Sequence, residues 1–547
     1  MSSSQFRTHE VINQPQPMGP INSYLSDLPL REAVARFGGA WGEDHLVRAG
    51  ESYGGEMVEL GEQANRNKPV FQPFDRYGRR IDHVDFHPAY HQLMANAMCH
   101  QVHSFSWQHQ GTRGAFVIRG ALFYLHCQAE AGTACPICMT HAVVPSLRLS
   151  PEIAEQWLPR LLVADYDPRC LPATQKRAVT FGMGMTEKQG GSDVRRNTTR
   201  AVRQADGSYR ITGHKFFFSA PMCDAHLILA QAEQGLSCFL LPRVLPDGSL
   251  NEVRIQRLKD KLGDWANASS EVEFQEATAY LVGEEGRGVP TIIEMVSLTR
   301  LDCMLGSAGL MRQALVQAIH HTSQREAFGR LIIDQPLMRN VLADLALEVE
   351  ASVALALRVA AAVDAAGSNQ REALFARIAT AIGKYWICKR TPGFVNEAQE
   401  CLGGIGYVEE NILPRLYRQA PLNSIWEGSG NVQCLDVIRA LRKEPGVSEA
   451  LFDELQQGLG QHPAYDQQVA WLQDAFSDLE TLESRSRLVV EKAALALQAS
   501  LLLRAGQAEI AEAFCRSRLA HNGGYAYGTL DAQAPIDLLI QRATPQG

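Results

Sequence analysis

A single Trp-Glu pair stands between two glycine clusters in the second half of the chain. Glu427 follows Trp426, with the cluster Gly403-Gly404-Ile405-Gly406 before this pair and Gly428-Ser429-Gly430-Asn431 after it. A carboxylate beside an indole, in a turn that opens a helix, loses hydration, and this raises its pKa toward that of a general base. The same position suits an acidic residue that stabilises a helix N-terminus. The local sequence leaves both interpretations open.

A glycine-rich segment, GMGMTEKQGGSDV at 182–194, precedes the first strongly β-like stretch. Gly190 and Gly191 can turn successive backbone N–H groups toward one ligand, and Thr186 and Ser192 add hydroxyl groups. This combination suits an anion or a polar ring. A tight turn between a helix and a strand explains the glycines equally well.

Farther along, HKFFFSAP at 214–221 places Phe217 and Phe218 beside Ser219 in a predicted strand. An aromatic run is most often part of a hydrophobic core, but a flat redox ring needs an aromatic wall with a hydroxyl group beside it. Both roles are compatible with this segment.

Two clusters contain the residue types of metal sites. Cys135 and Cys138 have the CxxC spacing of zinc and redox motifs, but the chain has no second CxxC. Four histidines have spacings compatible with one helix face, without an acidic ligand: His87, His91, His100 and His103. We predict structural cysteines, solvated or core histidines, and no metal site.

The elements that must position these residues change in texture along the chain. Within the polar first 80 residues, helical patterns occur near 23–37 and 55–66. Short β-rich segments fill most of 179–283, and amphipathic runs at 290–325, 336–366, 370–401 and 430–442 predict an antiparallel helical bundle. The predicted regions are an N-terminal extension and helical domain (1–179), a β domain (180–284), a four-helix bundle (285–443) and a C-terminal helical appendage (444–547).

The composition is that of a globular protein. The 547 residues are 46% hydrophobic and 20% charged, which excludes disordered, collagenous and coiled-coil chains. A formal net charge of −8 disfavours a protein that coats nucleic acid through bulk charge. The first residues lack the apolar core of a secretory signal, and no apolar run has the length of a membrane span. We therefore expect a cytoplasmic protein with no membrane partner, whose 12 scattered cysteines are reduced.

Several of these segments occur together in one order. Between about residues 80 and 442, the set TEKQGGSD, HKFFFS, RLKDKLG…SSEVEF, RLDCMLG…QREAFGRL, CLGGIGY and SIWEGSGN resembles the acyl-CoA dehydrogenase superfamily. MTEKQGGSD, SIWEGSGN, the N-terminal VINQPQP and the extra C-terminal helices are similar to its AidB-like branch of adaptive-response flavoproteins, linked to protection against DNA alkylation. The resemblance implies a mainly α homotetramer that contains FAD, with a helical domain, a central β-barrel, a four-helix bundle and the appendage.

The resemblance also implies roles for individual residues around FAD. Those that would line the flavin are Met183, Met185, Thr186, Gly191 and Ser192. Those that would back the isoalloxazine ring are Phe217, Phe218 and Ser219. Those around the Glu427 position that would also bind this cofactor are Trp426, Gly428, Ser429, Gly430 and Asn431. Those that would contact the FAD of a neighbouring subunit are Arg325, Phe328, Gly403 and Gly404.

Glu427 falls where the family keeps its catalytic base. In the implied reaction it takes the α-proton of an acyl-CoA-like thioester, while a hydride leaves the β-carbon for flavin N5. A subset of the family has its base on an earlier helix, at a position that Thr299 occupies here, so Glu427 is the candidate in this chain. The sequence leaves the acyl chain and the electron acceptor undefined.

The resemblance also raises an alternative function. The AidB-like branch is thought to bind double-stranded DNA, and Arg439 matches an arginine implicated there. Residues 445–547 carry thirteen acidic and seven basic residues, which is an unfavourable balance for binding phosphates. The two hypotheses are thus an acyl-CoA dehydrogenase of weak activity in the response to DNA alkylation, and a DNA-binding protective flavoprotein with vestigial dehydrogenase activity.

Overall fold

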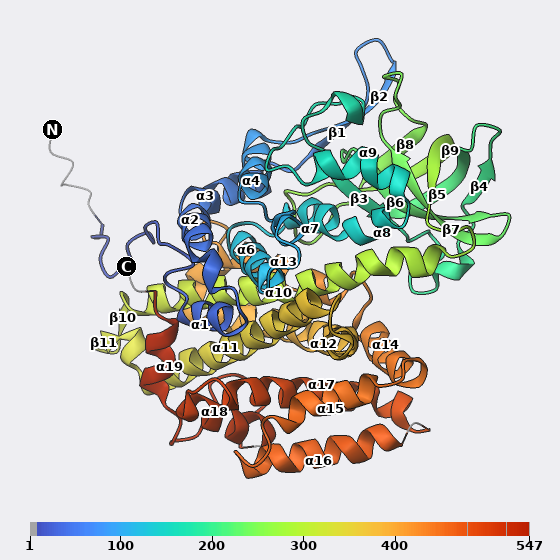
Figure 1. Ribbon diagram of the computed structural model, residues 1–547. Helices are drawn as coiled ribbons and strands as arrows, with labels where there is room; N and C mark the ends of the chain where they lie inside the picture. Colours follow the sequence, from blue (N-terminus) through green and yellow to red (C-terminus); the bar gives the residue numbers. More distant parts are fainter. Residues whose placement is uncertain (1–7, 479, 521, 546–547) are drawn as a thin grey trace, which may run out of the picture.

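The computed structural model describes residues 8–478, 480–520 and 522–545. A helical domain, a β-barrel, a helical bundle and a set of C-terminal helices follow one another along the chain (Figure 1). This arrangement confirms the predicted fold class.

The N-terminal domain consists of helices interrupted by one hairpin. Its helices are α1 (Leu28–Arg36), α2 (Glu43–Tyr53), α3 (Glu56–Arg66), α4 (Pro88–Cys99), α5 (Phe105–Gln108), α6 (Ala115–Ala129), α7 (Ala134–Ala142), α8 (Val144–Arg148) and α9 (Pro151–Leu161). The hairpin pairs β1 (Val70–Phe74) with β2 (Arg80–Asp85) and projects from the domain (Figure 1). Neither α2 nor this hairpin was among the elements that the sequence predicted.

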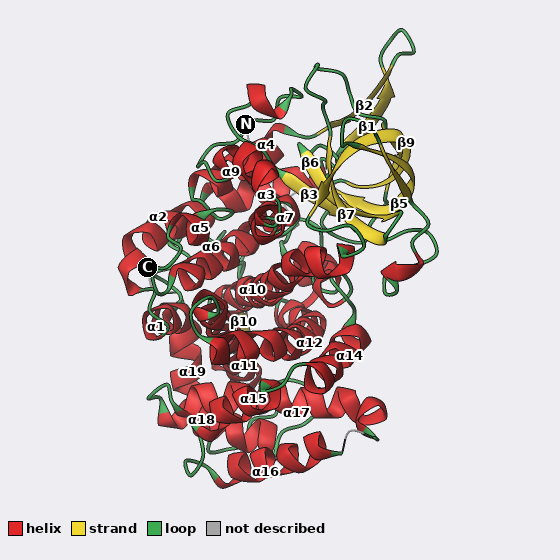
Figure 2. Cartoon of the chain, turned by 45° about the vertical axis from the view of Figure 1, so that its right-hand side comes forward, coloured by secondary structure: helices red, strands yellow, loops and turns green. Residues whose placement is uncertain are grey.

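The β domain is a closed barrel. Its strands are β3 (Phe181–Gly184), β4 (Arg200–Arg203), β5 (Tyr209–Ser219), β6 (Ala225–Ala232), β7 (Gly235–Pro242), β8 (Val253–Leu258) and β9 (Ser269–Val282). The ring runs β6–β7–β9–β5–β4 and closes where β4 pairs with β6, while β3 extends from β6 and β8 from β9. Figure 2 looks into this ring of strands. Because the ring is closed, successive side chains along each strand point alternately into the packed interior and to the outer face.

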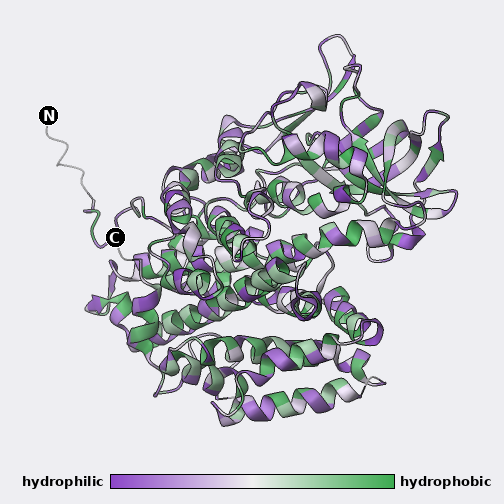
Figure 3. Ribbon diagram, in the orientation of Figure 1, coloured by the Kyte–Doolittle hydropathy of each residue, from purple (hydrophilic) through white to green (hydrophobic). Residues whose placement is uncertain are grey.

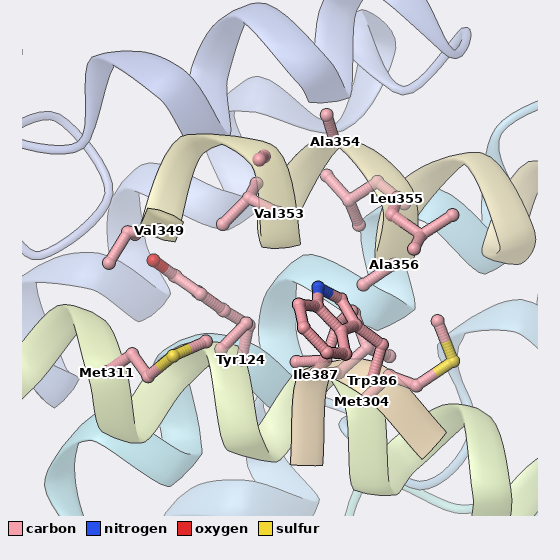
Figure 4. Close-up of a cluster of buried hydrophobic side chains, with 14 of the residues drawn as sticks. Tyr124, Met304, Met311, Val349, Val353, Ala354, Leu355, Ala356, Trp386 and Ile387 are labelled. Carbon is pink, nitrogen blue, oxygen red and sulfur yellow. The ribbon is translucent and has the colours of Figure 1, made fainter. Parts of the chain in front are cut away.

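The bundle is built from long helices that match the predicted runs closely. Its elements are α10 (Gly288–Thr322), the hairpin β10 (Glu326–Ala327) and β11 (Arg330–Leu331), α11 (Pro336–Ala365), α12 (Gln370–Cys401), α13 (Leu413–Gln419) and α14 (Gly430–Lys443). Figure 3 shows hydrophobic residues along the packed helices. In the core, Tyr124 of α6, Met304 of α10, Val353 of α11 and Trp386 of α12 meet (Figure 4).

The C-terminal helices are tied to the rest of the chain by ion pairs. They are α15 (Val447–Gln456), α16 (Pro463–Ser477), α17 (Leu482–Leu503), α18 (Ala508–Phe514) and α19 (Ile536–Ala543). Arg358 of α11 pairs with Glu454 of α15 at 2.8 Å. Arg542 of α19 pairs with Glu32 of α1 at 2.6 Å and with Glu350 of α11 at 2.8 Å. The appendage is therefore fixed to the bundle.

Across the described part of the chain, every helix is too short or too polar to span a lipid bilayer.

Candidate active site

Glu427 lies in the turn that leads into α14. The backbone is left-handed at Glu427 (φ 57°) and at Gly428 (φ 96°). This conformation costs a residue other than glycine about 1–3 kcal/mol, so surrounding groups must hold it in place. The Glu427 carboxylate accepts a hydrogen bond of 2.8 Å from Oγ1 of Thr299 on α10. The carboxylate thus contacts α10, while α14 begins after Ser429.

Two side chains bind the Glu427 carbonyl oxygen. Nε of Arg300 and Nε2 of Gln433 each donate to it at 3.0 Å. Arg300 also pairs with Asp436 at 2.7 Å, and Arg377 reaches the same carboxylate at 3.0 Å. Arg300 is therefore neutralised by a buried acid, while it helps to hold the turn.

Lys384 of α12 binds the carbonyl groups on both sides of Glu427. Its Nζ donates to the Trp426 oxygen at 2.8 Å and to the Gly428 oxygen at 2.5 Å. The side chain is buried, with 1% of its surface exposed. Sequence reasoning missed Lys384, because nothing in its local pattern indicates a contact more than 40 residues along the chain.

Burial raises the pKa of Glu427 above its ordinary value. The hydrogen bond from Thr299 and the charges of Lys384 and Arg300 act in the opposite direction and favour the ionised form. A desolvated carboxylate with these partners has the properties of a general base.

The strand that was expected to back a ring presents its aromatic residues to opposite sides. Phe217 is 51% exposed, whereas Phe218 is 1% exposed and stacks on His226 inside the barrel, with ring centroids 3.9 Å apart. Ser219 lies two positions after Phe217 and shares its side of the strand. Phe217 and Ser219 are thus available to a ligand, and Phe218 belongs to the barrel core. The two-residue period of a strand was the signal that distinguishes them.

The barrel wall and the Glu427 turn converge on one hydrophobic cluster. Met185 and Trp426 both pack against this cluster, which includes Cys135 of α7. Cys135 interacts with the hydroxyl of Ser219 and with the charge of Glu427. Residues from the barrel and from the bundle therefore meet in the same region.

The glycine-rich loop after β3 forms a small cradle. Met183 is buried at 8% exposure, and Gly190 has a φ of 140°, which favours glycine. A Cβ atom on Gly191 would collide with the hydroxyl of Thr186, so backbone and hydroxyl lie side by side there. Ser192 is exposed next to them. These residues can offer polar groups to a ligand edge.

A buried ion pair anchors this loop. Nζ of Lys215 lies 2.9 Å from Glu187, and both side chains are fully buried. Glu187 also accepts bonds from the backbone N–H groups of Thr198 and Thr199, at 2.7 Å and 3.2 Å. Burial opposes ionisation, but Lys215 and the hydrogen bonds outweigh it and hold the pKa of Glu187 below its ordinary value. Sequence reasoning did not identify this pair.

The residues expected to reach a neighbouring subunit lie on the outer surface. Phe328, in the turn between β10 and β11, is 99% exposed. Arg325 donates to the carbonyl oxygen of Asn13 at 3.0 Å. Gly403 and Gly404 are exposed, and an added Cβ atom would meet nothing within 4 Å.

Arg325, Phe328, Gly403 and Gly404 are called the outer group below. Helix α10 separates Arg325 and Phe328 of this group from Glu427. From Thr299 to Thr322 the helix rises roughly 35 Å, at about 1.5 Å per residue. The β10–β11 hairpin follows its far end (Figure 1). Arg325 and Phe328 therefore cannot contact a ligand that lies beside Glu427 of the same chain.

The residues after Glu427 face the appendage and the solvent. Gly430 is buried, while Ser429 and Asn431 are exposed. The Asn431 side-chain oxygen accepts a bond of 3.3 Å from Arg487 of α17. Farther along α14, the Arg439 side chain is 62% exposed and lies 3.5 Å from Asp436.

The cysteines and histidines with metal-like spacing have separate surroundings. Cys135 and Cys138 lie on α7 as free thiols. His87 accepts from the first turn of α4, His91 contacts a tyrosine hydroxyl at 2.9 Å, and His103 contacts a backbone carbonyl at 3.0 Å. Over the described ranges, no group of three or more His, Cys, Asp or Glu residues is arranged to hold a metal ion.

Comparison with known families matches three parts of the chain. The adaptive response protein AidB N-terminal domain matches residues 13–168. The middle domain of acyl-CoA dehydrogenases matches residues 182–277, and their C-terminal domain matches residues 286–442.

Individual relatives extend this similarity over the whole chain. The putative acyl-CoA dehydrogenase AidB of Escherichia coli K12 is 48% identical over 541 residues, which cover 98% of this chain and 99% of that protein. The structure of Caenorhabditis elegans ACDH-11 in complex with C11-CoA has a TM-score of 0.86 at 27% identity and covers 94% of each chain. An acyl-CoA dehydrogenase from Bacillus anthracis complexed with FAD shares the fold, with a TM-score of 0.65 at 16% identity, over 84% of this chain and 87% of that one.

Proposed function

This chain belongs to the AidB branch of the acyl-CoA dehydrogenase family, and we propose that it oxidises an acyl-CoA-like thioester with bound FAD and with Glu427 as the base. The observation that carries this proposal is the desolvated Glu427 carboxylate, held by Thr299 in a turn beside the barrel wall.

The residues around this turn fit a flat cofactor with polar edges. Phe217 offers an exposed aromatic face with the hydroxyl of Ser219 beside it. Thr186 and the backbone of Gly191 form a cradle that a side chain would fill. The proposed flavin contacts in the same chain are Met185, Thr186, Gly191, Ser192, Phe217, Ser219, Trp426, Gly428, Ser429 and Asn431, with Met183, Phe218 and Gly430 packed behind them. FAD, when bound, accepts the hydride that leaves the β-carbon.

Glu427 can act as the base because its surroundings limit both the hydration and the conformational freedom of its carboxylate. Glu427 takes the α-proton onto its carboxylate, and the electron pair of the broken C–H bond becomes the α,β double bond as the hydride departs. Thr299 keeps one carboxylate oxygen in place, so the proton acceptor is oriented before the substrate binds. The raised pKa makes Glu427 a stronger proton acceptor than an exposed glutamate.

The C11-CoA complex of ACDH-11 supports a fatty acyl-CoA as the class of substrate. We therefore place the thioester between the Glu427 turn and the Phe217–Ser219 wall.

Anaerobic mixing with a series of acyl-CoA thioesters tests this function. We expect the oxidised-flavin absorption band to bleach, and Glu427→Gln to slow the bleaching by about 10²–10⁴-fold while FAD stays bound. Glu410→Gln, which changes an exposed glutamate, is the matched control. Unchanged absorption of the wild-type protein with every thioester, or full activity of Glu427→Gln, contradicts the proposal.

A second proposed function, within the response to DNA alkylation, is binding of double-stranded DNA. The exposed Arg439 side chain supports it, because its contact with Asp436 leaves most of the guanidinium open to a phosphate. The expected result is salt-dependent retardation of a DNA duplex in a gel, weakened by Arg439→Ala and not by Arg485→Ala. Equal migration with and without protein at low salt excludes this function.

We also propose a homotetramer in which the outer group completes the cofactor site of another subunit. The exposure of Phe328 and the open space beside Gly403 and Gly404 support this assembly, because a large apolar side chain and bare backbone there are open to another chain.

A further inference from the structure

We propose that Lys384 is a positioning residue for the reaction, whose ammonium group holds the turn that presents the Glu427 carboxylate. This inference rests on the proposed function, and it means that α12 contributes a residue that positions the base.

The geometry of the contact is the first argument. One ammonium group bonds to the carbonyl oxygens of Trp426 and Gly428, at 2.8 Å and 2.5 Å. These two carbonyl groups flank Glu427 and point to the same cation, in a turn whose backbone is left-handed at Glu427 and Gly428. Lys384 therefore constrains the strained part of the turn through hydrogen bonds on both sides of Glu427.

The charge of Lys384 is the second argument. Within the described residues, no carboxylate lies within 4.0 Å of its Nζ, although the side chain is 1% exposed. Arg300, the other cation at the turn, is paired with Asp436 at 2.7 Å. A buried ammonium group without an ion pair is costly, and the structure retains it where two backbone carbonyl groups need a donor.

The other groups near Glu427 do not replace this charge. From α10 it faces Thr299, Arg300 and Cys303, and from α7 it faces Cys135 and Cys138. Burial raises the pKa of all three thiols and keeps them neutral near pH 7. Lys384 is thus an unneutralised positive charge acting on the base.

Two substitutions separate the two effects of Lys384. Lys384→Gln retains hydrogen-bond donors without the charge, whereas Lys384→Met removes both. Without the two hydrogen bonds to the backbone carbonyl groups, the Glu427 carboxylate is misplaced. Without the charge of Lys384, the pKa of Glu427 rises, because a nearby cation favours the ionised form. The acidic limb of the pH profile of kcat therefore moves to higher pH in both variants.

The experiment uses the holoenzyme with an acyl-CoA that bleaches the wild-type flavin. We expect Lys384→Met to lower kcat by about 10–100-fold, Lys384→Gln to lower it less, and Lys384→Arg to restore the wild-type pH profile. Amide hydrogen exchange of a peptide covering 423–430 should be faster in Lys384→Met. Lys389→Met, an exposed lysine on the same helix, is the matched control and should behave as wild type.

The outcomes distinguish this inference from the proposed function. Failure of every thioester to bleach the wild-type flavin overturns the function. Normal bleaching of the wild type, together with unchanged kcat, pH profile and exchange in Lys384→Met, overturns the role of Lys384. If Lys384→Met does not fold, the pH profiles of Lys384→Gln and Lys384→Arg decide: a profile of Lys384→Gln that matches wild type overturns the role.

Discussion

The Glu427 turn and the outer group around Phe328 and Gly403 differ in how many contacts their residues receive from the same chain. In the turn, Thr299 bonds the carboxylate, and Lys384 bonds two of the surrounding carbonyl groups. In the outer group, Phe328 is 99% exposed and Gly403 faces open space. Both regions have left-handed backbone at a residue other than glycine, at Glu427 and at Phe328.

This difference indicates what each region needs. A strained residue that is held by donors of its own chain is prepared for chemistry before any ligand arrives. The Phe328 turn is held by the pairing of Ala327 with Arg330 and by a bond from Gln335 to the Ala327 carbonyl, but the Phe328 ring itself stays exposed, as a surface open to the proposed partner would be. Substitutions should therefore damage the inner region through folding and chemistry, and the outer region through assembly.

The largest expected effect concerns the buried pair behind the glycine-rich loop. Glu187→Ala leaves the Lys215 ammonium unpaired in a fully buried position and should lower the free energy of unfolding by about 3–5 kcal/mol. Urea denaturation followed by circular dichroism measures this loss. Glu233→Ala, at an exposed turn of the same barrel, should change it little. Equal stabilities of the two variants would show that the Glu187–Lys215 pair does not stabilise the fold.

The second effect tests the outer group. Phe328→Asp places a charge where a partner is proposed, and it should weaken assembly by about 2 kcal/mol or more. Light scattering coupled to gel filtration should show a smaller particle, and the protein should release FAD more readily. Tyr525→Asp alters another fully exposed aromatic residue and serves as the control. A variant that keeps the wild-type mass and FAD content shows that Phe328 takes no part in assembly.

A smaller effect is expected from the bond to the carboxylate. Thr299→Val removes a donor that favours ionised Glu427, so the pKa of Glu427 should rise further. Because the base must be ionised, the acidic limb of the kcat profile should shift upward, with about a tenfold loss for each pH unit on that limb. Ser297→Ala changes a hydroxyl on the exposed side of α10 and should leave the profile in place. A profile that stays fixed in both variants removes Thr299 from the site.

The smallest effect concerns the contact between the appendage and the turn. Arg487→Ala removes an exposed 3.3 Å bond to Asn431 and should weaken FAD binding by less than about 1 kcal/mol. Fluorescence titration of the apoprotein with FAD measures the difference, with Arg485→Ala for comparison. A loss of tenfold or more in affinity would mean that the appendage is part of the cofactor site rather than a neighbour of it.

Sequence patterns predicted the elements that depend on local periodicity. The run expected at 370–401 is α12 with the same bounds, and the run at 336–366 ends one residue after α11. The β1–β2 hairpin escaped prediction, because its polar residues and turn signals are typical of a loop as well. Strands β3 and β4 have four residues each, too few for a visible alternation.

The residues of the candidate site also fall into those that local sequence predicts and those that depend on contacts between distant segments. Glu427 stands out by its glycine neighbours and by the resemblance, and in the structure it is half-buried and bonded to Thr299. Lys384 and the Glu187–Lys215 pair depend on contacts between distant segments, which single-sequence reasoning cannot place. Phe218 was grouped with Phe217 although adjacent residues of a strand point to opposite faces, so this separation was available from the sequence.

The 35-residue length of α10 has a consequence for how defects combine. If the Thr299 end serves the flavin of its own chain and the hairpin end serves that of a neighbour, each catalytic centre is a product of two polypeptides. Mixing a chain impaired at Glu427 with one impaired at Phe328 would then regenerate some intact centres, where an intact carboxylate and an intact hairpin meet across the boundary. Activity restored by co-expression would show that each catalytic centre is built from residues of two chains.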